Sequence, residues 1–202
     1  MSSRTARWVA AMTAAACIAV PAATARADLL GPAADACGSQ QLVRPFLPWL
    51  DPDQYFLAGD GGLEAGAQGW QLANGARATS GNEQWFVNGT GDTQSLYLPA
   101  GGVAVSPPAC VELVDPTIRF FARSLGGTLK VDVTLRVAGI PATLPVGVVV
   151  SGSAFAPTPV LPLLANLTSP LAGGSSSVVI RFTALGGAVQ VDDLFVDPFK
   201  VN

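Results

Sequence analysis

Residues 128–137 read TLKVDVTLRV, an unbroken alternation of apolar and polar side chains. Successive side chains of a β-strand point to opposite faces of a sheet, so the run predicts a strand with one buried and one solvated face. The side chains expected to face the core are Leu129, Val131, Val133, Leu135 and Val137.

The chain from Gly61 onward has the same character. Its apolar runs are short, β-branched and punctuated by glycine and proline, which number 22 and 16 in the full sequence. No window keeps a helical period, so strands are favoured. Strands are expected near Leu63 and at 70–79, 83–87, 94–98, 102–106, 117–124, 128–137, 143–150, 157–163, 176–184 and 188–196. This spacing predicts an all-β fold, an antiparallel β-sandwich or jelly roll.

The N-terminus has the pattern of an export signal. Arg4 and Arg7 precede an apolar stretch that runs to Ala23, and small residues follow up to Ala27. This order predicts a cleavable signal peptide at 1–27 and a secreted, extracellular protein.

Two forms of membrane attachment are the alternatives to free secretion. A transmembrane anchor is disfavoured, because Pro21 interrupts a stretch that is short of the roughly 20 residues a spanning helix needs. Residues 14–17 resemble a lipobox without its leucine, so lipid attachment through Cys17 ranks second. In the mature chain the longest apolar candidate, 137–150, is cut by Pro141 and Pro145 and predicts no anchor.

Two segments are expected after cleavage. Residues 28–59 form an irregular N-terminal arm, because Pro45, Pro48 and Pro52 prevent a regular ladder, and residues 60–202 form the sandwich domain. The apolar side chains that would anchor the arm to the domain are Phe46, Leu47, Trp49, Tyr55 and Phe56.

Charge and cysteine content limit the partners and the covalent structure that can be expected. Without residues 1–27 the chain keeps 8 basic and 14 acidic residues, a formal charge of −6. An acidic surface repels phosphate backbones, so no nucleic-acid partner is expected. The two remaining cysteines, Cys37 and Cys110, are predicted to form a disulfide because the protein is exported.

The sequence contains no histidine. This excludes a Ser-His-Asp triad, an imidazole base and a His-ligated metal. Oxidised cysteines provide no nucleophile. Carboxylate chemistry remains, because a glycosidase needs only two suitably spaced acids.

Two segments resemble a known family. Residues 60–66 read DGGLEAG and are followed by Gly69-Trp70, and residues 189–196 read VQVDDLFV. They resemble the opening and closing strands of carbohydrate-binding-module jelly rolls of the galactose-binding-like type, over residues 60–198. In such modules these two strands are neighbours. The resemblance therefore places Glu64 close to Asp192 or Asp193 and implies a structural calcium between these carboxylates. The alternative is that Glu64 is exposed and that the aspartates face solvent or cap a turn.

A second resemblance is to a group of uncharacterised secreted actinobacterial proteins, and it implies no activity. The segments that carry it are Pro48-Trp49, 55–57, 81–83, 106–108 with Cys110, and 119–123.

Sugar binding requires exposed aromatic rings flanked by polar groups. The candidate ligand-binding residues are Trp85, Tyr97 and Trp49. Trp85 and Phe86 are adjacent in a predicted strand, so one of the two rings is expected to be in the core.

The preferred interpretation is a secreted, non-enzymatic module that binds carbohydrate or another cell-envelope ligand. The first alternative is a structural or protein-interaction domain of the cell surface. The second alternative is a carboxylate-based, glycan-active enzyme.

Overall fold

The computed structural model describes residues 37, 40–112, 116–137, 140–165 and 175–197. The predicted signal peptide at 1–27 and the lipid-attachment alternative at Cys17 lie outside these residues. Within them, no helix has the length and apolar character needed to cross a membrane.

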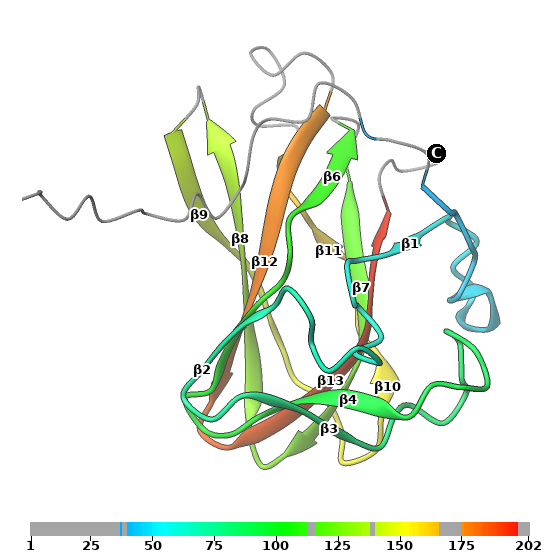
Figure 1. Cartoon of the computed structure of the whole chain (residues 1–202), viewed down its shortest axis with the longest axis vertical. Coiled ribbons are helices and arrows are strands. Elements are labelled where there is room, and N and C mark those ends of the chain that lie inside the picture. The colour runs from blue at the N-terminus through cyan, green and yellow to red at the C-terminus, as the bar shows by residue number, and fades with distance from the viewer. Residues whose placement is uncertain (1–36, 38–39, 113–115, 138–139, 166–174, 198–202) are drawn as a thin grey trace, which may run out of the picture.

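The described residues form two antiparallel sheets packed face to face (Figure 1). This confirms the predicted all-β sandwich of the jelly-roll class with an irregular N-terminal arm. One sheet, here called the β13 sheet, has the order β10-β7-β13-β4-β3, with β1 added to β13 and β11 to β7. Its strands are β1 (Phe56–Leu57), β3 (Arg77–Ser80), β4 (Gln94–Leu98), β7 (Thr117–Leu125), β10 (Ala156–Pro157), β11 (Leu161–Pro162) and β13 (Ala188–Asp197).

The other sheet, here called the β12 sheet, has the order β2-β5-β12-β8-β9, with β6 paired to β12. Its strands are β2 (Gln71–Ala73), β5 (Val103–Val105), β6 (Ala109–Glu112), β8 (Thr128–Val137), β9 (Ile140–Val149) and β12 (Ser175–Leu185).

The core lies between the two sheets. Strand β8 has the predicted bounds, and its alternate apolar residues from Leu129 to Leu135 are fully buried. Val137 is the exception to the predicted pattern: as the last residue of β8 it lies at the end of the sandwich and is exposed. Trp70 packs in the core against Phe182, and its Nε1 donates to the carbonyl oxygens of Gly59 and Asp60.

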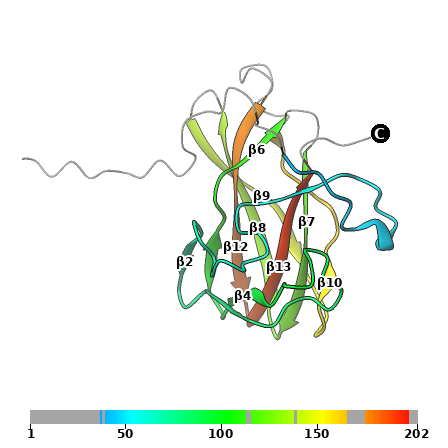
Figure 2. The ribbon, with the colours of Figure 1, turned by 45° about the vertical axis from the view of Figure 1, so that its right-hand side comes forward.

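The N-terminal arm lies on the face of the β13 sheet that points away from the core (Figures 1 and 2). It contains the 3-10 helix η1 (Leu47–Trp49). Phe46 and Tyr55 of the arm pack against Phe121 of β7 and Phe195 of β13 in a second apolar cluster. The predicted Cys37–Cys110 disulfide is present and joins the arm to β6.

An ion pair also fastens the arm. Arg119 of β7 lies 2.5 Å from Asp51 of the arm, and the same carboxylate accepts a hydrogen bond from the Tyr55 hydroxyl. Burial and the Asp51 carboxylate raise the pKa of Tyr55, which keeps this hydroxyl a donor. All three side chains are largely or fully buried, so the arm is an integral layer of the fold.

Several predicted strands were wrong in detail. Left-handed residues at Asn74 and Gly75 form a turn that splits 70–79 into β2 and β3. Only the ends of 157–163 pair with β7, and Leu63 lies in a turn region. Strand β6 was not predicted.

Residues 83–87, predicted as a strand, form turns instead, and both Trp85 and Phe86 are exposed. The expectation that one of these two rings enters the core was therefore also wrong.

Candidate functional site

The two motifs that open and close the domain lie side by side. The Leu194 N–H donates to the Gly61 oxygen (3.1 Å), and the Ala58 N–H donates to the Leu194 oxygen (2.9 Å). A Cβ atom at Gly61 would lie 2.7 Å from the Leu194 oxygen, so only glycine allows this approach. The approach brings the loop before β2 to the centre of β13.

A β-bulge in β13 positions two aspartates. The register with β7 shifts between Asp192 and Phe195, and Asp193 adopts a left-handed conformation with φ 49°. Side chains of a regular strand alternate between faces, but the bulge interrupts this alternation. Both aspartates consequently lie beside the segment that contains Glu83 and Asp92.

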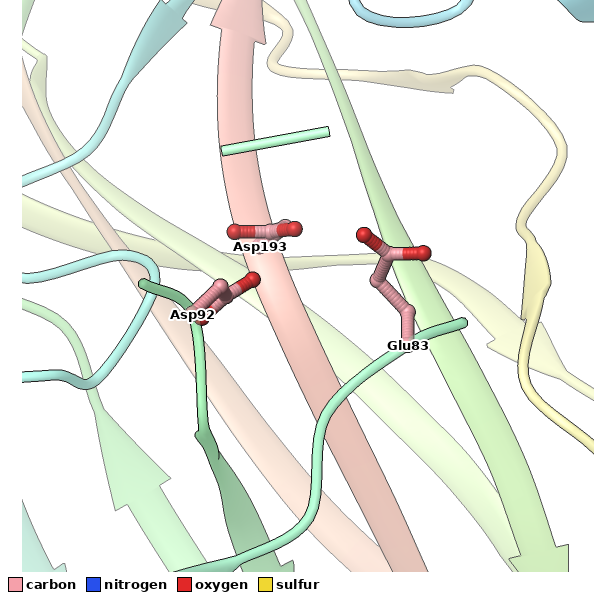
Figure 3. Close-up of side chains that lie close together, drawn as sticks. All are labelled: Glu83, Asp92 and Asp193. Atoms are coloured by element: carbon pink, nitrogen blue, oxygen red, sulfur yellow. The ribbon is translucent and has the colours of Figure 1, made fainter. Parts of the chain in front are cut away.

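Three buried carboxylates converge at this bulge. Ligand oxygens of Glu83, Asp92 and Asp193 all lie within 4.8 Å of one another. Figure 3 shows Asp193 on β13, with Asp92 and Glu83 reaching it from two loop segments. No described residue donates a hydrogen bond to any of the four carboxylate oxygens of Asp92 and Asp193.

The electrostatics of the cluster are unfavourable without a positive charge. Burial, followed by the neighbouring carboxylates of Asp192, Asp92 and Glu83, raises the pKa of Asp193 to about 9. Burial and the Glu64 carboxylate raise the pKa of Asp92 to about 7. Burial is also the largest cause that raises the pKa of Asp192, to about 8. Such a group requires either protons or a cation.

The residues present fit a hard divalent cation. Calcium prefers oxygen ligands and takes six to eight of them, from carboxylates and backbone carbonyls. Three carboxylates supply up to six oxygens, and those of Asp92 and Asp193 have no donor among the described residues. Glu83, Asp92 and Asp193 are therefore the residues that would hold the ion.

Two residues of the predicted metal set have other partners. Exposed Glu64 accepts hydrogen bonds from the backbone N–H groups of Thr93 (2.8 Å) and Gln94 (2.6 Å). Partial burial would raise the pKa of Glu64, but these bonds outweigh it and the pKa lies below its usual value. Asp192 accepts the Glu83 N–H (2.7 Å). Of the predicted set, Asp193 alone belongs to the three-carboxylate cluster among the described residues.

Glu83 and Asp92 were not predicted as ligands. Both lie in loop segments, nine residues apart, in a stretch predicted from the sequence to be a strand and a loop. The local signal is the density of glycine at positions 81, 89 and 91, which indicates tight turns. Their proximity to Asp193 depends on the tertiary packing of segments far apart in the sequence.

Trp85 and Trp49, two of the predicted ligand-binding residues, form one aromatic group. The Trp85 ring is perpendicular to Trp49 (centroids 5.0 Å apart) and tilted against Phe121 (5.5 Å). Trp85 is 40% exposed, whereas Trp49 is half-buried. The Trp85 ring is thus held by rings from the arm and from β7 while part of it faces solvent.

Tyr97, the third predicted residue, lies elsewhere on the same face. It belongs to a cross-strand row in the register Arg77–Tyr97–Gln190–Arg123, which runs over β3, β4, β13 and β7. The Arg77 guanidinium lies 4.4 Å above the half-buried Tyr97 ring. Arg123 donates through Nε to Gln190 Oε1 (2.5 Å). Arg123 is two residues from Phe121 on β7, so the row begins next to the ring that supports Trp85.

No family model and no curated protein matches the sequence. Solved structures similar to this chain include the CBM22-1–GH10 modules of Clostridium thermocellum xylanase 10B complexed with xylohexaose. They are 12% identical over 68% of this chain and 27% of that chain, with a TM-score of 0.48. The CBM22-1 xylan-binding domain of Paenibacillus barcinonensis Xyn10C is 14% identical over 83% of this chain and all of that one, with a TM-score of 0.47.

A further similar structure is TmCBM61 in complex with β-1,4-galactotriose. It is 13% identical over 68% of this chain and 94% of that chain, with a TM-score of 0.42. This chain spans about a quarter of the length of the xylanase chain described above. At these identities the likeness concerns the fold alone.

Proposed function

We propose that this protein is a secreted, non-catalytic module that binds carbohydrate on the outer face of the β13 sheet. The observation that carries the proposal is the Trp85 ring, partly exposed and supported by Trp49 and Phe121. A ring held in place by its neighbours can stack on the apolar face of a sugar with little loss of side-chain freedom.

The polar row beside Trp85 supplies partners for sugar hydroxyls. It crosses four neighbouring strands, a distance of about 14 Å at ~4.8 Å per strand spacing, which suits a short oligosaccharide. Arg77, Tyr97 and Arg123 carry hydrogen-bonding groups along it. Buried Gln190 positions Arg123 on this face.

The carboxylate cluster does not suit catalysis on a polysaccharide. Glu83, Asp92 and Asp193 are all buried, with exposed fractions of 0%, 3% and 0%. A glycosidase acid must reach the glycosidic oxygen of a bound chain. We therefore assign these residues to a structural calcium ion as part of the proposal.

Truncation of Trp85 tests the binding proposal. Trp85→Ala is expected to weaken binding to a polysaccharide selected on a glycan array by roughly 5- to 150-fold, about 1–3 kcal/mol, by analogy with stacking of bases on aromatic rings. Calorimetric titration measures it, and the melting temperature should remain nearly unchanged. The control is Leu50→Ala, which removes an exposed apolar side chain of the arm and should leave affinity unchanged. Equal affinity of Trp85→Ala and wild type, or release of reducing sugar, would contradict the proposal.

Removal of calcium tests the metal assignment. With calcium at 100 times its Kd, chelation should cost about 2.7 kcal/mol of stability. For a domain of this size that lowers the melting temperature by about 5–10 °C. Asp193→Asn should abolish the difference between calcium-loaded and chelated protein in a calorimetric scan. Glu64→Gln is the matched control, because Glu64 is bonded to Thr93 and Gln94, and it should retain the difference. No response of wild type to calcium would overturn the assignment.

A further inference from the structure

The loop that carries Trp85 begins and ends at the carboxylate cluster. Glu83 stands at its start and Asp92 at its end, and both reach Asp193 of β13. Figure 3 shows the two side chains approaching Asp193 from separate segments of this loop. Both ends of the 83–92 loop thus lie at the same small group of oxygens.

Glu83 also shapes the interior of the loop. Its carboxylate accepts hydrogen bonds from the backbone N–H groups of Trp85 and, at 2.6 Å, Val87. Its own N–H is bonded to Asp192. The backbone around the indole is therefore positioned by a carboxylate that also faces the cluster.

The same loop contains an unfavourable backbone conformation. Phe86 has φ 52°, a left-handed conformation that costs free energy for a bulky side chain. The backbone N–H of Gly89, at φ 124°, donates to the Phe86 oxygen (2.9 Å), and the backbone N–H of Asp92 donates to the Gly89 oxygen (3.1 Å). A strained loop persists only where its surroundings hold it. Here those surroundings are the bonds to Glu83 and the contacts of Asp92.

Without a cation, the cluster has no attraction of its own that would hold the two loop ends together. Asp193 lies close to Glu83, Asp92 and Asp192, and Glu64 lies next to Asp92. Without a cation these carboxyl groups either repel one another or bind protons, and in neither state does the cluster itself draw the two loop ends together. A cation between the carboxylates adds an attraction to each of them, and this attraction draws both loop ends toward Asp193.

We propose that a calcium ion held by Glu83, Asp92 and Asp193 sets the position of the 83–92 loop, so that the Trp85 ring is placed on Trp49 and Phe121 only in the calcium-loaded protein. Carbohydrate affinity is then calcium-dependent. This last step rests on the function proposed above, whereas the movement of Trp85 does not.

Tryptophan fluorescence of the mature protein, without any sugar, tests the movement. Calcium added to chelated protein should shift the emission to shorter wavelength and lower the acrylamide quenching constant of Trp85 by about twofold or more, because the ring becomes packed. Trp85→Phe should reduce this change to the smaller contribution of Trp49, which contacts the ring at position 85, because the remaining described tryptophan, Trp70, lies in the core. Magnesium, which holds its water more strongly, serves as the comparison ion.

Matched variants locate the effect. Asp92→Asn and Asp193→Asn should each raise the calcium concentration at half-change by at least tenfold, and Asp53→Asn, at an acidic residue of the arm outside the cluster, should leave it within about twofold. If circular dichroism shows that Asp193→Asn does not fold, Asp92→Asn still provides the measurement. Calcium that raises the melting temperature without a Trp85-dependent change in fluorescence would overturn the proposal, as would a fluorescence change of undiminished size in Trp85→Phe.

A sugar titration separates this inference from the proposed function. If both hold, affinity for the selected polysaccharide falls at least fivefold after chelation, and Trp85→Ala no longer responds to calcium. If the fluorescence change is present and no polysaccharide binds, the loop inference stands and the carbohydrate function fails. If binding is strong and equal with and without calcium, the loop inference fails and the carbohydrate function stands.

Discussion

Phe46→Ala is expected to lower the free energy of unfolding by about 3–5 kcal/mol, the range for removal of a fully buried aromatic ring. Phe46 is fully buried although it belongs to an irregular arm. The centroid of its ring lies 5.1 to 5.6 Å from the ring centroids of Tyr55, Phe121 and Phe195. The Arg119 guanidinium carbon lies 4.7 Å from the same centroid. Alanine would leave a cavity between the arm and the β13 sheet.

Urea denaturation measures this effect. Leu50→Ala is the matched control, because Leu50 lies in the same arm, is apolar and is 93% exposed. It should change stability by no more than about 0.5 kcal/mol. A loss below about 1 kcal/mol for Phe46→Ala would mean that the arm contributes little to the folded state. The Trp49 contact with Trp85 would then also need another explanation.

The arm explains the arrangement of rings on the outer face of the β13 sheet. Phe121 and Phe195 belong to strands whose other face lines the core, and water would meet their rings if nothing covered them. Phe46 and Tyr55 cover them, so the sandwich has a third, partial layer. The Trp49–Trp85 pair lies at this layer, which links the stability of the arm to the proposed binding surface.

The fold could be predicted from sequence because its signals are local. The alternation in 128–137 identifies the core-facing residues of β8, and β8 has the predicted bounds. The opposite face, predicted to be solvated, is so only in part, because Asp132 and Thr134 are buried. The prolines of the arm indicated irregular structure, and the apolar residues between them, such as Phe46 and Tyr55, indicated that it is anchored. Strand β6 was missed because only four residues pair there, in a segment next to prolines.

The candidate site was predicted only in part because it depends on long-range contacts. Asp193 was found through its motif in the closing strand, but its partners Glu83 and Asp92 are more than 100 residues away. The 83–87 run has the alternating polar and aromatic side chains of a strand. The Glu83 carboxylate instead binds the N–H groups of Trp85 and Val87, which a strand would offer to a neighbouring strand.

Loss of the disulfide is expected to have an effect of similar size to Phe46→Ala. Cys37 and Cys110 are 73 residues apart in sequence. In the chain-entropy model, removing such a cross-link stabilises the unfolded state by about 4 kcal/mol. The Cys37→Ser/Cys110→Ser double variant should therefore lose about this amount in urea denaturation. Reduced wild type should unfold at the same urea concentration.

The disulfide and Phe46 should also be coupled, because both hold the same arm. With the disulfide intact, an arm weakened by Phe46→Ala stays tethered to β6 and can still cover Phe121. Without the disulfide, the arm already comes away from the β13 sheet, and Phe46→Ala then costs less because contacts already lost cannot be lost again. The combined variant should lose at least about 1 kcal/mol less than the sum of the separate losses. Additive losses would show that the tether and the aromatic cluster stabilise independent parts of the fold.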